Sequence, residues 1–231
     1  MTVIHSQRYR LRFSKRDRLR FISHRDLLRT FERALRRAGL RVTHTQGFNP
    51  RPKLTFALAL PLGVESIDEI VDIELDQALE PSEVLLRMQQ ALPEALQPHG
   101  CELVPSKAKL LVVASDYQVT FPDVDPAALL AAVERFQASE APRLNRERKG
   151  RVRVIALDHH VFDLRVEGEG LAFSIKADES GSLKPNELLQ WLGFDDTEVL
   201  VRKVKTQLDS DQANDAPNID ASDDPQASES C

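Results

Sequence analysis

The order of strand and helix patterns constrains this 231-residue chain most, because the same order occurs twice. In the first half, residues 8–13 alternate charged and apolar side chains, which is the period of a half-buried strand. Ser23 with Asp26 three residues later matches a helix N-terminal capping pattern, and Gly39 ends the helix. Strand patterns then cover residues 41–45, 54–60 and 69–75, a helix begins at residue 81 and runs to about residue 92, and residues 101–104 form a closing strand.

The second half repeats this order. Asp125 and Pro126 begin a helix that runs to residue 136, with the aspartate as N-cap and the proline at the first helical position. Strand, helix, strands, helix, strand is the split βαβ pattern, so the sequence predicts an α+β fold of two tandem ferredoxin-like halves. The expected elements are a strand at 117–121, strands at 152–157, 161–167 and 171–177, a helix at 185–192 and a strand at 198–205.

Three segments follow from this pattern. Residues 1–105 form the first ferredoxin-like half, residues 106–207 form the second, and residues 105–115 join them. Residues 208–231 contain seven Asp and Glu, no Lys or Arg and no aromatic residue. Such a segment buries too little apolar area to offset the entropy of ordering, so we predict a disordered acidic tail. This tail acts either as a solvating appendage or as a competitor that folds back on an anion-binding surface.

Composition excludes several classes of protein. Cys101 and Cys231 are the two cysteines, and no C-x-x-C motif exists, so this chain alone holds no iron–sulfur cluster and no four-cysteine zinc site. The sequence contains no cofactor-binding motif and no glycine-rich loop that would bind a phosphate, so we expect no cofactor. No apolar run is long enough to span a membrane. We therefore expect a cytoplasmic protein without a membrane partner.

Charge is distributed very unevenly. Residues 1–53 contain 15 Lys and Arg against three Asp and Glu, although the whole chain has a net charge of −5. On the first predicted helix, five arginines recur at helical spacing opposite the Leu and Phe face: Arg25, Arg29, Arg33, Arg36 and Arg37. Arginine suits phosphates and stacked bases because its planar guanidinium makes bidentate contacts. This face therefore binds a nucleic acid, docks an acidic protein partner, or is a solvated face.

A loop at residues 45–53 follows, and it is stiffened by two prolines. Gln46, Phe48 and Asn49 supply an aromatic ring and amides, which are the groups needed to stack a base and read its edge. The alternative is a rigid connection with Phe48 in the core. The complete set of predicted RNA or anion contacts is Arg12, Lys15, Arg20, Arg25, Arg29, Arg33, Arg36, Arg37, Gln46, Phe48, Asn49, Arg51 and Lys53.

Candidates for catalysis and metal binding are few. His24 and His44 lie in the basic segment and could act as a general acid and base on a phosphodiester, or they are surface residues. His159 and His160 lie beside two aspartates, which a metal site would need. The acidic residues of 65–76 alternate with apolar ones, which favours a solvated strand face over a metal site. We expect no metal site.

Five stretches carry a resemblance to a known family. They are RLRFSK (10–15), LRFISH (19–24), FERALRRAGL (31–40), QGFNPRP (46–52) and LPLGVES (60–66). The chain resembles the radical SAM-linked protein family, a domain of unknown function. That domain occurs alone or fused behind radical SAM proteins that have a cobalamin-binding region. Where the family often has Leu, this chain has Arg25.

The resemblance implies a radical SAM protein as partner. Combined with the basic surface, it leads to a non-catalytic accessory protein that binds a polyanion, RNA, and presents it to the radical SAM enzyme. Two alternatives remain. Tandem ferredoxin-like domains with basic surfaces are similar to CRISPR-type repeat-processing endoribonucleases, in which His24 or His44 would be catalytic. The chain could also be a protein-only adaptor that docks its arginines on the radical SAM partner.

Overall fold

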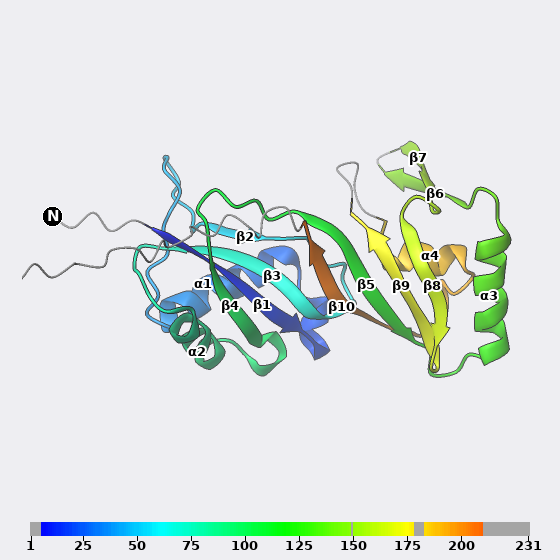
Figure 1. The fold of residues 1–231 in the computed structure, drawn as a ribbon, viewed down its shortest axis with the longest axis horizontal. Coiled ribbons are helices and arrows are strands. Elements are labelled where there is room, and N and C mark those ends of the chain that lie inside the picture. Colours follow the sequence, from blue (N-terminus) through cyan, green and yellow to red (C-terminus); the bar gives the residue numbers. More distant parts are fainter. Residues whose placement is uncertain (1–5, 149, 178–182, 210–231) are drawn as a thin grey trace, which may run out of the picture.

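The computed structural model describes residues 6–148, 150–177 and 183–209 (Figure 1). The first half contains four strands and two α-helices. In chain order they are β1 (Gln7–Lys15), α1 (His24–Arg37), β2 (Leu54–Phe56), β3 (Glu65–Leu75), α2 (Pro81–Ala91) and β4 (Pro98–Val104). Short 3-10 helices at Asp17–Phe21 and Glu94–Leu96 precede α1 and follow α2.

The second half repeats this plan with one addition. Its elements are β5 (Val112–Thr120), α3 (Pro126–Ala138), β6 (Arg143–Arg148), β7 (Arg151–Ala156), β8 (Val161–Glu167), β9 (Gly170–Lys176), α4 (Pro185–Trp191) and β10 (Leu200–Leu208). The predicted N-cap is confirmed, since the Asp125 side chain accepts a hydrogen bond from the Ala127 backbone N–H at 2.9 Å.

Strand order is the same in the two halves. The first half reads β4–β1–β3, with β2 paired to the other edge of β3, and the second reads β10–β5–β9–β8. Each half is thus a split βαβ unit whose fourth strand lies beside its first. The predicted α+β fold of two ferredoxin-like halves is confirmed.

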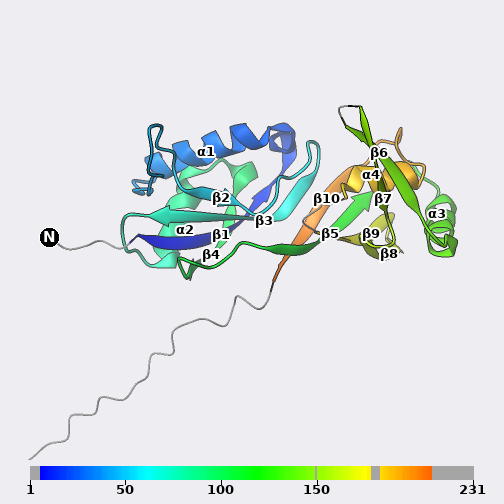
Figure 2. The ribbon, with the colours of Figure 1, turned by 90° about the horizontal axis from the view of Figure 1, so that it is seen from above.

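The two halves share one sheet. β3 and β10 pair in parallel, with Arg202 opposite Glu65 and Lys203 opposite Ser66. Each half nevertheless has its own apolar cluster, between the sheet and its two helices: Phe13 and Phe31 are central in one, and Tyr117 and Phe173 in the other. The helices cover one side of this long sheet, as the view in Figure 2 shows for α1 and α4.

Some predicted strands differ from the structure. Residues 41–45 form only isolated bridges at Val42 and His44, and the strand predicted at 54–60 ends at Phe56. The strand predicted at 152–157 does not join the main sheet, because β7 pairs with β6 in a separate hairpin that the sequence did not predict. Five arginines in β6 and β7 obscure the apolar alternation of a strand. β10 extends through Leu208, and residues 210–231 of the predicted tail lie outside the described residues.

Candidate nucleic-acid interface

α1 presents a row of arginines to solvent because its apolar side chains all point to the sheet. Ser23 caps the helix as predicted, accepting a hydrogen bond from the Asp26 backbone N–H at 3.2 Å. Leu27, Phe31, Ala34 and Leu35 are buried. Five arginines of α1 are exposed on the remaining surface, and four of them, Arg25, Arg29, Arg33 and Arg36, are called the arginine face below.

The arginine face has little internal neutralisation. Arg29 lies 3.6 Å from Asp26, and both side chains are about half exposed, so this pair contributes little. Within the described parts of the chain, no ion pair is found for Arg25, Arg33 or Arg36. Arg37 differs, since its guanidinium donates to the Ala91 carbonyl at the end of α2 and holds the two helices together.

A groove of about 610 Å³ runs between α1 and α2, and three arginines line it: Arg33, Arg37 and Arg87. Arg87 forms an ion pair with Glu83 one turn earlier on α2. The sequence analysis missed Arg87, because a single arginine in a mixed helix gives no signal until the two helices are packed together. The groove extends the cationic surface from α1 to α2.

The arginines of β1 have a different role. Arg8, Arg10 and Arg12 point to the side of the sheet away from the helices, where they meet acids of β3. Arg10 makes two hydrogen bonds to Asp72, at 2.8 and 3.0 Å, and both side chains are buried. Arg8 contacts Glu74 at 2.9 Å. The acidic stretch, expected as a solvated face, is therefore largely buried and paired.

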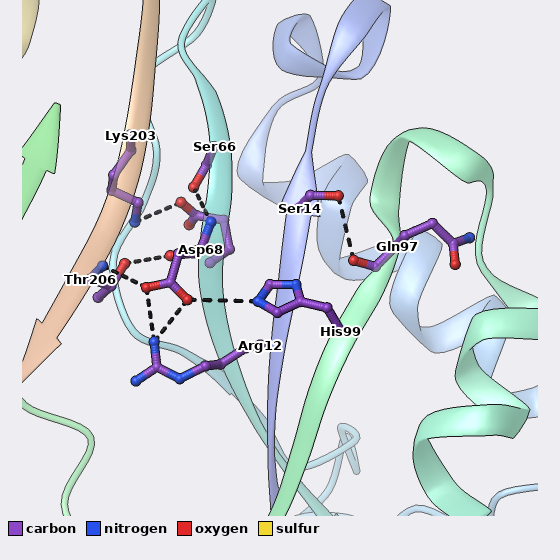
Figure 3. Close-up of polar contacts among 9 residues, drawn as sticks. Arg12, Ser14, Ser66, Asp68, Gln97, His99, Lys203 and Thr206 are labelled. Carbon is purple, nitrogen blue, oxygen red and sulfur yellow. Dashed lines mark hydrogen bonds and ion pairs between the residues drawn. The ribbon is translucent and has the colours of Figure 1, made fainter. Parts of the chain in front are cut away.

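Arg12 belongs to a polar cluster around Asp68 (Figure 3). Its guanidinium contacts both Asp68 carboxylate oxygens at 2.8 Å, and the Thr206 backbone N–H donates to the same carboxylate at 2.6 Å. His99 lies 4.0 Å from it. Because Thr206 is on β10, this cluster joins the two halves, and Arg12 is a structural residue.

Three more predicted contacts also have internal partners. Lys15 is 2 % exposed, its ammonium lies beside the carbonyl of Ile22 at 3.2 Å, and burial lowers its pKa against the opposing effect of Glu69. Arg20 lies 3.3 Å from Glu65 and above the Phe21 ring. Lys53 contacts Glu74 at 2.7 Å. Lys15 in particular cannot reach RNA, which corrects its place in the predicted set.

The pKa values of Glu65 and Glu74 show that several of these cations bind carboxylates within the fold. Burial acts to raise the pKa of each carboxyl, but hydrogen bonds outweigh burial, and the pKa is lowered. Glu65 accepts these bonds from Arg202, the Asp17 backbone and Arg20. Glu74 accepts them from Lys53 and Arg8. Both carboxylates are therefore charged partners of the basic segment. The local charge seen in residues 1–53 is partly neutralised by β3.

The loop after α1 projects as an arm, residues 42–53, held by backbone hydrogen bonds from Thr45 to Arg51 and from Lys53 to Thr43, both 2.8 Å. Phe48 at its tip is fully exposed, so the alternative that places this ring in the core is wrong. Gly47 has φ +141°, a backbone conformation that residues other than glycine rarely adopt. Gln46, Asn49 and Arg51 are also exposed.

The histidines among the described residues are not assembled into a site. His24 packs edge-on against Phe56, with ring centroids 5.2 Å apart, and His44 bridges to Pro52 in the arm. His159 lies 3.8 Å from Asp158. Among the described residues, no group of three or more His, Cys, Asp or Glu could hold a metal ion. Cys101 is no nucleophile, since burial and then Glu102 raise its pKa to about 12.

A second groove, called the junction groove, lies where the halves meet. It has a volume of about 660 Å³ and is lined by residues 58–62, by the start of α4 with Lys184 and Asn186, and by Tyr117 and Lys203. Lys203 is buried and lies 2.6 Å from Glu69. Burial, and then Glu69, raises the pKa of Tyr117. Sequence reasoning missed this groove because its walls come from both halves.

Comparisons with known proteins add a family. The model of a family described as "Uncharacterized protein conserved in bacteria (DUF2344)" matches residues 8–185. No curated protein matches. A chain in the crystal structure of a Cbf5-Nop10-Gar1 complex is similar at 13 % identity and a TM-score of 0.42, over 86 % of this chain and 48 % of that one. This chain thus spans about half the length of that protein.

A further solved structure is an unknown protein from Galdieria sulphuraria, with 13 % identity and a TM-score of 0.30, covering 87 % of this chain and 100 % of the other. No helix among the described residues is long and apolar enough to cross a membrane.

Proposed function

This chain belongs to the uncharacterized bacterial family DUF2344, and for it we propose a non-catalytic role in which the arginine face and the 42–53 arm bind RNA. The bound RNA is presented to a radical SAM enzyme. In this proposal the protein works in the cytoplasm, where it meets its RNA.

One observation carries the RNA-binding part. The arginines of β1 are matched by acids of β3, whereas Arg25, Arg33 and Arg36 have no acidic partner in the described chain. Like charges three and four residues apart on a helix repel each other. A polyanion supplies the missing negative charge and releases its own counterions on binding.

The tip of the arm favours single-stranded RNA over an acidic protein. Phe48 offers a free aromatic face beside Gln46, Asn49 and Arg51, all exposed. Base stacking on such a ring tolerates any sequence and contributes about 1–3 kcal/mol per base. An acidic protein surface has no general use for this ring.

The radical SAM partner rests on the resemblance of residues 10–66 to the radical SAM-linked family. The partner would supply the iron–sulfur cluster and the radical chemistry, and this chain would hold the substrate. A pull-down with the tagged full chain should capture a protein with a radical SAM cysteine motif. If the variant Arg29→Glu/Arg33→Glu/Arg36→Glu still captures this partner, the result supports the proposal that the chain presents RNA to it. If the variant loses the partner but binds RNA as tightly as the wild type does, the result contradicts the proposal.

RNA binding is tested by fluorescence anisotropy of labelled cellular RNA across a salt series. The triple variant Arg25→Ala/Arg33→Ala/Arg36→Ala should flatten the slope of log affinity against log salt by about 2, because each phosphate contact on a single strand contributes about 0.7. Phe48→Ala should weaken binding about tenfold through the lost stack.

A matched control removes three exposed cations elsewhere: Lys107→Ala/Arg165→Ala/Lys205→Ala. This variant should retain the wild-type slope. No binding by the wild type at low salt would refute the proposal and leave the arginine face to an acidic protein partner. Cleavage of RNA by the wild type that disappears in His24→Ala/His44→Ala would refute the non-catalytic role.

A further inference from the structure

The junction groove has apolar walls and a polar floor. Its volume of about 660 Å³ lies within the range of about 300–1,000 Å³ that is usual for ligand pockets. Leu60, Pro61 and Pro185 belong to its walls, which come from the segment before β3 and from the start of α4. Walls of this kind suit the two faces of a flat, apolar ring.

The charges around the groove are balanced within the chain. On the floor, Lys203 lies 2.6 Å from Glu69, and both side chains are buried. Lys15 also interacts with Glu69, but it is held by backbone carbonyls and does not line the groove. Lys184 is exposed at the rim and acts on Glu187 of the same turn. Because Lys203 is already paired, we expect the floor to take an uncharged part of a ligand rather than a phosphate.

Two uncharged groups of the groove can form hydrogen bonds with a ligand, the hydroxyl of Tyr117 and the amide of Asn186. Tyr117 is 7 % exposed, and burial and then Glu69 raise its pKa, so its hydroxyl keeps its proton and can donate. Ser115 lies two residues earlier on the same side of β5, and its buried Oγ has no hydrogen-bond partner among the described residues. Buried hydroxyls are normally hydrogen-bonded. The floor near Tyr117 therefore has hydrogen-bonding capacity that the described chain does not use.

This combination fits a nucleobase. A hydroxyl and a side-chain amide can each donate and accept a hydrogen bond, and the edge of a base presents both donors and acceptors. The faces of a base are flat and apolar enough to lie against leucine and proline side chains. An aliphatic chain would fill the walls but leave the Tyr117 hydroxyl and the Asn186 amide without partners.

An exposed apolar surface connects the arginine face with the groove. Phe21, four residues before Arg25, is 61 % exposed, and Leu62 is 61 % exposed. The Gly63 backbone N–H donates to the carbonyl of Arg20 at 3.1 Å, which fixes this segment against the 3-10 helix that precedes α1. A second hollow of about 470 Å³ lies here, and Leu62 and Asn186 line both this hollow and the junction groove. A strand bound at the start of α1 can therefore continue over Phe21 to the groove.

We propose that the junction groove binds one unstacked base of the RNA strand that the arginine face holds. The base lies between the apolar walls, Tyr117 and Asn186 form hydrogen bonds with its edge, and the backbone phosphates stay outside the groove. Unstacking costs least in a strand that is already single. This inference rests on the proposed function and names the place where a single nucleotide is held apart from the strand.

The test uses two strands of about 12 nucleotides, a usual size for a single-strand binding site: oligouridine, and a strand of equal length and charge in which every nucleotide is abasic. Tyr117→Phe removes only the hydroxyl and keeps the ring that stacks on Phe173. It should weaken oligouridine binding about fivefold, because one hydrogen bond is lost. The slope of log affinity against log salt should not change, since no phosphate contact is removed. Binding of the abasic strand should be unchanged.

A second variant does not touch the core. Asn186→Ala changes an exposed side chain at the start of α4 and should weaken oligouridine binding about threefold while leaving the abasic strand unaffected. Its matched control is Gln137→Ala, which removes an exposed amide from α3 and should bind both strands as the wild type does. Urea unfolding of each variant shows whether the fold is retained.

The outcomes separate this proposal from the proposed function. If Tyr117→Phe and Asn186→Ala bind oligouridine like the wild type, while Arg25→Ala/Arg33→Ala/Arg36→Ala does not, the base site is refuted and the proposed function stands. Equal weakening for the abasic strand also refutes the base site, because that strand has no base to lose. Failure of the wild type to bind either strand refutes the proposed function itself.

A nucleotide in the groove could also come from solution, and uridine 5′-monophosphate distinguishes this source. Under the proposal, the free nucleotide competes with oligouridine only weakly, since the arginine face supplies most of the affinity for the strand. Tight binding of the monophosphate that is lost in Tyr117→Phe, with the oligouridine affinity unchanged, would assign the groove to a free nucleotide and overturn the assignment to RNA.

Discussion

The arginines of β1 and those of α1 belong to one basic segment, but the fold uses them in different ways. On β1, Arg8, Arg10 and Arg12 alternate with core residues and meet Glu74, Asp72 and Asp68 on β3. On α1, the side opposite the core faces solvent, and no strand of acids lies against it. The charge counted along the sequence therefore predicts the electrostatic field at the surface only when the cations that are paired with acids inside the fold are left out of the count.

The largest expected effect comes from breaking a pair on β1. Asp72→Ala leaves the Arg10 guanidinium buried without its carboxylate, and removal of one partner of a buried pair costs about 3–5 kcal/mol. The free energy of unfolding, measured with urea, should fall by that amount. The double variant Arg10→Met/Asp72→Leu should recover most of it, because both charges are then gone. A loss below 1 kcal/mol for Asp72→Ala would show that the pair is not structural.

A smaller effect concerns Glu65, which links the basic segment to β10 through Arg20 and Arg202. Its pKa is lowered in the folded protein, so the unfolded chain takes up the proton more readily. Its stabilisation is therefore present above the ordinary pKa of 4.5 and is lost as pH falls through the lower folded pKa. Glu65→Gln should reduce the unfolding free energy by about 2 kcal/mol at pH 7.

The same variant gives the pH test. Urea titrations from pH 7 to pH 3 should show the difference between wild type and Glu65→Gln shrinking below pH 4.5. A difference that stays constant with pH would mean that the carboxylate charge contributes nothing.

The smallest expected effect has the opposite sign. Arg33 lies three or four residues from Arg29, Arg36 and Arg37, and each like-charged pair on a helix costs about 0.2–0.5 kcal/mol. Arg33→Ala should therefore raise the unfolding free energy by up to about 1 kcal/mol at low salt while it weakens RNA binding. The gain should vanish in 1 M salt, where such repulsion is screened. Destabilisation by Arg33→Ala would place Arg33 with the arginines of β1.

Local sequence rules worked where one segment supplied all the information. Ser23 and Asp125 cap their helices as predicted, because a cap involves only neighbouring residues. The repeated element order gave the two halves, since apolar periodicity directly reports which side of an element is buried. The β6 strand was not predicted, because Arg143, Arg146 and Arg148 leave its sequence without an apolar period.

The candidate site was predicted only in part. The exposed positions of Arg25, Arg29, Arg33 and Arg36 follow from helical spacing within one segment. Arg12, Lys15 and Arg20 were assigned to the same surface, but Asp68, backbone carbonyls and Glu65 hold them internally. Asp68 and Glu65 lie 56 and 45 residues away from their partners, at a separation that no local pattern describes.

The sequence by itself determined the two ferredoxin-like halves, the capped helix α1 and the arginines along its outer side, because these depend on periodicity and near neighbours. Only the tertiary structure decided which cations remain exposed and that Phe48 lies in solvent. The physical reason is strand pairing: the register of β3 against β1 and β10 brings distant carboxylates onto some cations and leaves others without a partner.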